Sequence, residues 1–146
     1  RALQEIEATH RAEHLAALTR LLFADPPPQV TEPALELLTD HADPTAAAAL
    51  LHTAERGLDP GLSVTVGRAL AAIRDPRAIP VTLDALDAGL PPLDAMEAGD
   101  LLVQLTGREI DVEDPESLAA LRGWWEREGE SLSWEEEVEG FRGEEP

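Results

Sequence analysis

The side chains of this sequence that are best suited to chemistry are its histidines and carboxylates. His10 and His14 are four residues apart, so a helix would place both imidazoles on one face. Glu7 and Glu13 lie nearby. Two imidazoles do not complete a metal site, however, and the His-Glu-x-x-His arrangement that joins a metal to a general base is absent. We therefore expect no metal site.

The carboxylates do not single out a reaction either. With 30 acidic residues in the chain, any two could be described as an acid and a base, and no pair stands apart. No Gly-rich phosphate loop, Gly-x-Ser-x-Gly elbow or Cys/His nucleophile pair occurs. We therefore expect a protein that is not an enzyme, with no catalytic residues and no cofactor.

One group of acids is denser than the rest and consists of Asp111, Glu113, Asp114 and Glu116. It could bind a cation, but it lacks the spaced oxygens and the turn glycine of a calcium loop. Asp114 directly precedes Pro115, and an Asp-Pro pair is typical of a helix start, where Asp caps free amides and Pro takes the first helical position. We therefore predict a helix cap at Asp114.

Length and composition indicate the kind of fold that carries these residues. A chain of 146 residues is in the usual range of a single domain. Hydrophobic residues make up 43% of the chain but aromatic residues only 3%, so the core has to be built from Ala, Leu, Val and Ile. That set suits closely packed helices better than a β-sandwich. With no cysteine, stability must come from packing alone.

The charge of the chain limits its partners. The formal net charge is −19, and all 11 cations are arginines. A field of this sign repels nucleic-acid phosphates and anionic lipids and attracts a basic partner. The absence of Lys and Asn is also typical of a GC-rich or a salt-adapted genome, in which case the acidity only keeps the protein soluble. No long apolar run and no signal peptide is visible, which predicts a cytoplasmic protein.

The most informative feature of the sequence is an internal repeat. Residues 43–74 and 75–106 match at an offset of 32 residues, and a fixed period of this length is typical of helical arrays. The identical pairs are Asp43/Asp75, Pro44/Pro76, Ala46/Ala78, Leu51/Leu83, Gly57/Gly89, Leu58/Leu90, Pro60/Pro92, Gly67/Gly99 and Leu70/Leu102.

Each repeat carries the signals of a helix, a tight turn and a second helix. An Asp-Pro pair opens the unit, a Gly ends the first helix and a Pro begins the second one. A Gly inside a helix costs about 1 kcal/mol relative to Ala, so Gly67 and Gly99 predict the close approach of a neighbouring helix. The second helices also share a predicted apolar stripe: Val66, Ala69, Leu70 and Ile73 in one repeat, and Ala98, Leu101, Leu102 and Leu105 in the next.

The chain before the repeats is a degenerate unit over residues 1–42. Helices are predicted over residues 13–24 and 31–42. Apolar spacing continues upstream, so residues 2–23 form either one long helix or two joined ones. His41 takes the place of an apolar residue of the repeats and is expected to be partly buried.

The chain after the repeats, residues 107–146, is predicted to cap the array. A helix is expected over residues 115–128. Trp134, Val138 and Phe141 are spaced four and three apart, which predicts a short amphipathic helix. This helix either folds back on the last helix pair or binds a partner, and the whole chain is expected to be one domain.

Part of the sequence resembles a known family. The run LAAIRDPRAIPVTLDAL is similar to the bacterial HEAT-like repeats first described in phycobilisome lyases, whose units read approximately Gly-Asp-Pro-Arg-Ala-Ile-Pro before a leucine-rich helix. Residues 75–80 match that string. Thr106, Gly107, Trp124 and Trp125 resemble the family's ending, where a Thr-Gly turn precedes a helix with a Trp pair. The resemblance implies an all-α fold, a short right-handed α-solenoid of antiparallel helix pairs in a HEAT-like superhelix.

A solenoid of this kind offers a candidate binding surface. Its second helices line the concave face, and the 32-residue offset identifies their exposed positions. We predict a mostly acidic strip there, which binds a partner together with the aromatic C-terminal end; alternatively, the strip is a solvated surface on which Arg68 pairs with acidic neighbours. The predicted partner-binding residues are Glu36, Thr65, Arg68, Glu97, Asp100 and Gln104 on the second helices and Trp134 and Phe141 at the C-terminal end.

These features predict a non-enzymatic interaction or scaffold module that binds another protein, and a basic one if the charge takes part. The resemblance adds an alternative, an accessory subunit of an enzyme that handles a bulky ligand, because the family includes scaffolds, accessory subunits and regulators. A third alternative is an acidic inhibitor or immunity-type protein that occupies a basic surface. None of the three predicts binding to nucleic acid or to a membrane.

Overall fold

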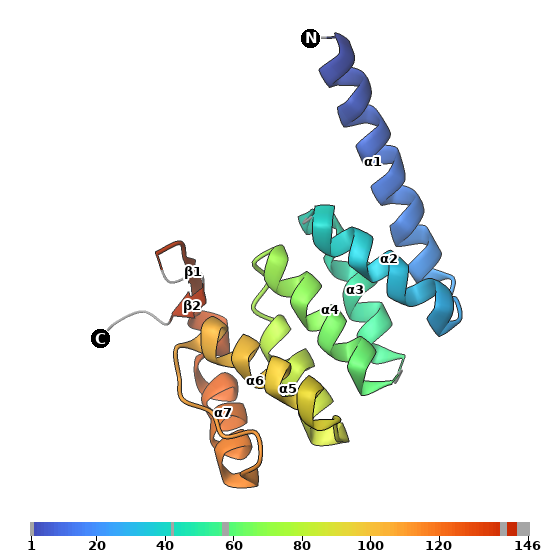
Figure 1. Cartoon of the computed structure of the whole chain (residues 1–146). Helices are drawn as coiled ribbons and strands as arrows, with labels where there is room; N and C mark the ends of the chain where they lie inside the picture. Colours follow the sequence, from blue (N-terminus) through green and yellow to red (C-terminus); the bar gives the residue numbers. More distant parts are fainter. Residues whose placement is uncertain (1, 42, 57–58, 138–139, 143–146) are drawn as a thin grey trace.

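Figure 1 shows the computed structural model of the chain, which is built from helices and one short hairpin. It describes residues 2–41, 43–56, 59–137 and 140–142, and for residues 2–12 and 41 it describes the backbone alone. The predicted all-α class is confirmed. The elements are α1 (Ala2–Phe23), α2 (Pro28–His41), η1 (Pro44–Ala46), α3 (Ala47–Glu55), α4 (Pro60–Ala72), α5 (Ala78–Ala88), α6 (Pro92–Thr106), α7 (Pro115–Glu128), η2 (Gly129–Ser131), β1 (Ser133–Glu135) and β2 (Gly140–Arg142), of which η1 and η2 are short 3-10 turns.

Most consecutive helices contact each other, and so do most alternate helices. α1 contacts α2, α3 contacts α4 and α5 contacts α6, while α4 also packs broadly against α5. In a second set of contacts α2 lies against α4 and α4 against α6, whereas α1 lies against α3 and α5 against α7. Figure 1 shows the resulting row of α2, α4 and α6, which brings three separate stretches of sequence side by side.

The N-terminal region begins with one long helix rather than two joined ones, since α1 runs unbroken over Ala2–Phe23. α2 begins at Pro28, earlier than the predicted start at Thr31, because Pro fits the first turn of a helix, where no N–H is needed. The Thr31 hydroxyl donates to the carbonyls of Pro26 (3.0 Å) and Pro27 (3.1 Å) and ties this turn to the helix. The side chain of His41, predicted to be partly buried, lies outside the described part of the chain.

Four Asp-Pro pairs begin helical segments, and the caps at three of them, Asp43, Asp75 and Asp114, are predicted from the sequence. The carboxylate of each Asp accepts a hydrogen bond from the backbone N–H two residues later. After Asp43 and Asp75 a tight turn comes first, so the α-helices begin at Ala47 and Ala78. The cap at Asp59 was not predicted. The N–H···O distances are 2.9 Å at Asp43, 2.8 Å at Asp59, 3.0 Å at Asp75 and 3.0 Å at Asp114.

Glycines with positive φ end two of the helices. Gly89 has a φ of 92° and follows α5, which confirms the predicted helix end. Gly107 has a φ of 68° and follows α6, where the Thr-Gly turn was expected. Both conformations are open to glycine without steric cost. Gly57, the predicted helix end of the earlier repeat, lies outside the described residues.

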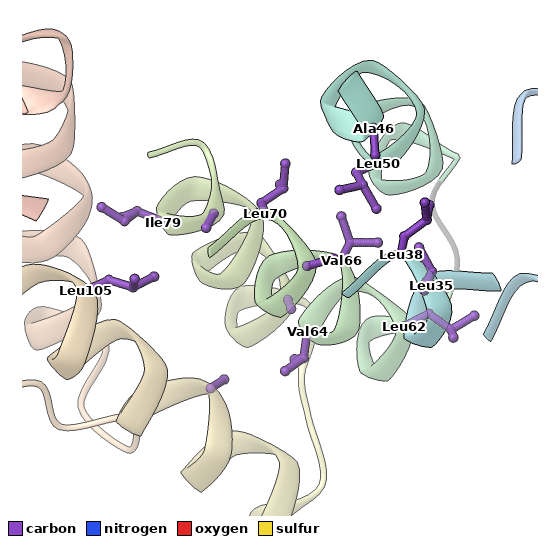
Figure 2. Packing of buried hydrophobic residues seen from close by; sticks show 14 of the residues in the cluster. Leu35, Leu38, Ala46, Leu50, Leu62, Val64, Val66, Leu70, Ile79 and Leu105 are labelled. Carbon is purple, nitrogen blue, oxygen red and sulfur yellow. The ribbon is translucent and has the colours of Figure 1, made fainter. Parts of the chain in front are cut away.

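The core is aliphatic apart from Phe141, and α4 contributes to it along most of its length. Figure 2 shows Val66 of α4 facing Leu50 of α3 and Leu38 of α2. No helix in the described ranges combines the length and apolar composition needed to cross a bilayer. The predicted apolar stripe is confirmed: Val66, Ala69 and Leu70 on α4 and Ala98, Leu102 and Leu105 on α6 are buried, and Ile73 and Leu101 are partly buried.

α4 and α5 approach each other closely at Gly67. A Cβ on Gly67 would overlap the Thr82 hydroxyl and lie 3.7 Å from the Ala78 carbonyl oxygen of α5. Thr82 is fully buried, and its hydroxyl donates to that carbonyl at 2.7 Å. The predicted close approach of a helix is therefore confirmed at Gly67. At Gly99 the neighbour is instead Val112, in the loop before α7, whose Cγ1 would lie 2.6 Å from an added Cβ.

The prediction of a C-terminal amphipathic helix is wrong, because β1 and β2 form an antiparallel hairpin in which Trp134 lies opposite Phe141. A helix would crowd the glutamates of this segment on neighbouring turns, and it would place a glycine in its interior. An added Cβ on Gly140 would overlap the Gln104 carbonyl oxygen of α6, so only glycine at this position lets the strand lie against the helix. The segment does fold back, since β2 packs against α6. Val138 lies outside the described residues.

Replacing Gly67 by Ala is expected to destabilise the protein, although Ala favours a helix by about 1 kcal/mol. The added methyl group overlaps the Thr82 hydroxyl, so the helices must separate or the buried hydrogen bond must break. We expect the free energy of unfolding to fall by about 1–3 kcal/mol, as measured by urea denaturation followed by circular dichroism. In G67A/T82A the overlap is absent, and the double variant should lose less than the sum of the single losses. Additive losses would contradict this account.

Candidate functional site

The predicted partner-binding residues of the second helices lie on the exposed side of α2, α4 and α6, which pack side by side. Glu36 of α2, Arg68 of α4 and Asp100 of α6 are all exposed. Thr65 is half-buried, and its hydroxyl donates to the Gly61 carbonyl at 3.3 Å. We name the set of Glu36, Thr65, Arg68, Glu97, Asp100 and Gln104 the acidic strip.

Within the acidic strip Arg68 pairs with Glu97. Their Nη1 and Oε2 atoms are 3.6 Å apart, and the side chains are 49% and 59% exposed. An exposed pair of this kind contributes less than about 1 kcal/mol, so an incoming cation can replace Arg68 at little cost. Glu36 and Asp100 form no ion pair within the described part of the chain. The pairing of Arg68 also fits the alternative of a solvated surface.

A groove of about 320 Å³ lies between α4, α6 and the hairpin, and we name it the strip groove. It brings together Arg68, Gln104 and Trp134, which come from three different elements and were all predicted to bind a partner. Glu36, on α2, is not part of its lining. Arg74, in the turn after α4, and Glu136, in the hairpin, add two charged side chains to the lining. The remaining lining residues are apolar: Ala71, Ala72, Leu101 and Leu105.

Phe141 and Arg142 fix the hairpin to the end of α6. Phe141 is 1% exposed, and its ring meets the Trp134 ring edge-on with centroids 5.1 Å apart. The Arg142 guanidinium donates to the Leu105 carbonyl at 3.2 Å, one of the last carbonyls of α6, which have no partner within the helix. Phe141 is therefore buried against the helix, and of the two predicted aromatic residues only Trp134 lines the strip groove.

Arg74 connects the end of α4 to the hairpin. Its φ is 60°, a left-handed conformation that costs a residue other than glycine about 1–2 kcal/mol. The backbone N–H groups of Arg74 and Asp75 bond back to carbonyls at the end of α4 (3.0 and 2.9 Å), in a Schellman motif where glycine is usual. The Arg74 guanidinium lies over the Trp134 ring at 5.3 Å and pairs with Glu136. These contacts offset the backbone strain.

A larger cavity of about 640 Å³ lies between the start of α3, the α4–α5 turn and the end of α7, and we name it the Trp125 cavity. The Trp125 ring lines it and packs against Gly129, where an added Cβ would lie 3.0 Å from the ring. Trp124 faces elsewhere, with the Arg108 guanidinium 5.2 Å from its ring. Sequence reasoning missed this cavity, because its walls come from three distant segments whose only signals were Asp-Pro turns and the Trp pair.

Asp75 and Arg77 form a bidentate ion pair in the lining of the Trp125 cavity. Arg77 Nε is 2.9 Å from Asp75 Oδ1 and Nη2 is 2.5 Å from Oδ2. Burial raises the pKa of Asp75, but hydrogen bonds from the Arg77 side chain and backbone outweigh burial and hold this pKa below its ordinary value. The hydrogen bond to Asp75 in turn raises the pKa of Arg77. The pair is therefore ionised at neutral pH.

The histidines and the dense acidic group do not come together as a metal site in the part of the chain that is described, where no three His, Asp or Glu side chains are grouped closely enough to hold an ion. His14 is exposed, and the side chain of His10 lies outside the described residues. Asp114 caps α7, which confirms that prediction, and Asp111 accepts a hydrogen bond from the Glu113 N–H at 3.0 Å. Asp111 and Asp114 therefore act as acceptors for backbone N–H groups.

Comparisons with protein-family models, with curated proteins and with solved structures found no match to this chain. The resemblance to HEAT-like repeats therefore stays an interpretation of the sequence. The two surfaces described above have to be interpreted from their own geometry and charge.

The strain at Arg74 can be separated from its side-chain contacts by two substitutions. R74A keeps the left-handed backbone and loses the hairpin contacts, whereas R74G loses both the strain and the contacts. We expect R74G to be more stable than R74A by about 1 kcal/mol in urea denaturation. Both variants should loosen the hairpin, seen as faster amide hydrogen exchange in β1 and β2. Equal stabilities of R74A and R74G would contradict the assigned strain.

The Asp75–Arg77 pair predicts a pH dependence of stability. Since the folded-state pKa of Asp75 is lowered, the pair stabilises the fold above the ordinary carboxyl value of 3.8, and this contribution is lost as the pH falls through the folded-state pKa. D75N retains a good helix cap but not the charge, so it should lower the free energy of unfolding by about 0.5–1 kcal/mol at neutral pH. In urea titrations the difference from wild type should shrink in acid. A difference independent of pH would refute the ionic contribution.

Proposed function

We propose that the chain is a HEAT-like α-solenoid and acts as a non-enzymatic interaction module for a basic segment of another protein. The solenoid interpretation is supported by the 32-residue repeat and by the order of the helix contacts, in which α2, α4 and α6 form a row. The caps at Asp43 and Asp75 and the buried glycines at Gly67 and Gly99 occupy equivalent places in the two repeats. On this proposal the whole chain is one interaction domain.

The observation that carries the interaction proposal is the strip groove. Arg68 and Gln104 were selected from the repeat offset and Trp134 from the aromatic C-terminal end, and all three line it. Trp is the residue type most enriched among the energetically dominant contacts of protein interfaces. Its ring here is half-buried and held by Phe141 and Arg74, so a partner would meet a fixed aromatic surface without paying to order it.

Charge favours a basic partner. Glu97 pairs with Arg68, which lines the strip groove, and Asp100 precedes the lining residue Gln104 by one turn of α6. Glu36 extends the acidic strip across α2. A basic segment lying across α2, α4 and α6 would meet these acids in turn, and the net charge of −19 would speed its approach. An acidic inhibitor of a basic protein would use the same surface. Affinity that falls steeply with salt would favour that second version.

Reversing the charge of the acidic strip is expected to abolish selective binding of basic peptides. Peptides are first selected on the wild-type protein from a random displayed library, and we expect Lys- and Arg-rich sequences. E36R/E97R/D100R should then bind the selected peptide at least about tenfold more weakly in fluorescence anisotropy. Trp134→Phe should also weaken binding, because the ring becomes smaller while the hairpin contact remains.

A matched control separates the acidic strip from the general field of the protein. E55R/E109R/E113R makes the same change in net charge at exposed positions outside the strip. We expect this variant to retain most of the affinity at physiological salt, where distant charges are screened. If both triple variants lose the peptide equally, or if neither does, the acidic strip is not the binding surface.

A further inference from the structure

The Trp125 cavity has the dimensions of a ligand site and is separate from the strip groove, with which it shares only Arg74. Its volume of about 640 Å³ lies within the range of roughly 300–1,000 Å³ that small-molecule sites occupy. Its walls come from the first turn of one repeat, the first turn of the next and the end of α7. Nothing in the proposed protein interaction uses it.

Part of the cavity lining is apolar. Ile73, Pro76 and Ala47 line it together with the indole ring of Trp125. The Trp125 ring is fixed in place, because Gly129 leaves only enough room for it on its other side. A flat or compact apolar group of a ligand would therefore find both an aromatic surface and aliphatic contacts.

The two cations of the cavity are already neutralised. Arg77 makes its bidentate pair with Asp75, and Arg74 pairs with Glu136 while it covers Trp134. Binding an anion would have to compete with both carboxylates. The cavity therefore does not offer a free positive charge to a phosphate or carboxylate.

Two acids of the lining have no such partner. Glu126 and Glu130 both line the cavity, and neither forms an ion pair with any cation in the described ranges. Glu126 is in the last turn of α7 and Glu130 is in η2, which follows α7 directly, so two like charges face the same cavity and repel each other. A cation placed between them would remove this repulsion. Trp125, from the preceding position of the same helix, adds the negative face of its ring to their charges.

We propose that the Trp125 cavity binds a small organic cation with an apolar body. The cationic group lies between the carboxylates of Glu126 and Glu130, and the apolar body packs on Trp125 and Ile73. The net charge of −19 increases the local concentration of such a cation. The proposal does not rest on the acidic strip, and each surface can fail its test without the other.

Three probes with one phenyl ring and different charges test the proposal directly: 2-phenylethylammonium, neutral 2-phenylethanol and anionic 3-phenylpropionate. Each is titrated into the full chain, and binding is followed by calorimetry and by amide chemical shifts. We expect saturable binding of the cation, with shifts confined to the α4–α5 turn and the end of α7. The neutral and anionic probes should bind at least about tenfold more weakly.

Matched variants assign the charge selectivity to the two acids. E126Q/E130Q is expected to reduce the affinity for 2-phenylethylammonium about tenfold and to leave the weak binding of 2-phenylethanol unchanged. The control E109Q/E113Q removes the same charge from exposed positions outside the cavity and should retain the affinity. Trp125→Leu should weaken all three probes, and its circular dichroism spectrum and thermal midpoint show whether it is folded. E36R/E97R/D100R should bind the cation like wild type.

Two outcomes would overturn the proposal. One is the absence of saturable binding of the cation up to about 10 mM, since a preformed site for a ligand of this size should bind at millimolar concentration or better. The other is binding of the neutral or anionic probe as tightly as the cation, or equal losses in E126Q/E130Q and E109Q/E113Q. Either result leaves the peptide test of the acidic strip unaffected.

Discussion

The close contact between α4 and α5 at Gly67 is the constraint on which the rest of the structure depends. α4 also contacts α2, α3 and α6, so the position of α5 against it determines where the α4–α5 turn lies and how α6 packs. Protein interiors are close-packed, and a displacement at one contact is passed on to its neighbours. Residues of α4 line the strip groove, and residues of the α4–α5 turn line the Trp125 cavity, so both surfaces depend on how α4 and α5 pack.

The α4–α5 turn contains an arginine in a backbone conformation where glycine is usual. Arg74 adopts the positive φ that glycine adopts freely, and it directly precedes the Asp75–Pro76 pair. The hairpin accounts for an arginine at this position, because the Arg74 guanidinium lies over the Trp134 ring and pairs with Glu136. One strained residue thus forms part of the walls of both the strip groove and the Trp125 cavity.

The helical framework could be predicted because its signals are local: a cap depends on a carboxylate and an amide two residues apart, and the stripe around Leu70 depends on helical spacing. The hairpin could not be predicted, because the spacing of Trp134 and Phe141 also suits a helix. The close contact of Gly140 with α6 favours a strand over a helix, and this contact is not visible in the sequence. Likewise the repeat offset located Arg68 on an exposed surface, whereas no pattern links the three segments that enclose the Trp125 cavity.

Docking of the hairpin onto α6 also implies an order of folding. The bond from Arg142 to the Leu105 carbonyl spans 37 residues, whereas α4 and α5 are consecutive helices joined by a short turn. Closing the longer loop costs more chain entropy, so neighbouring helices associate first and the hairpin docks last. Until the hairpin docks, Leu105 and the C-terminal end of α6 are exposed to solvent. We therefore expect a folding intermediate to aggregate first through this end of the molecule.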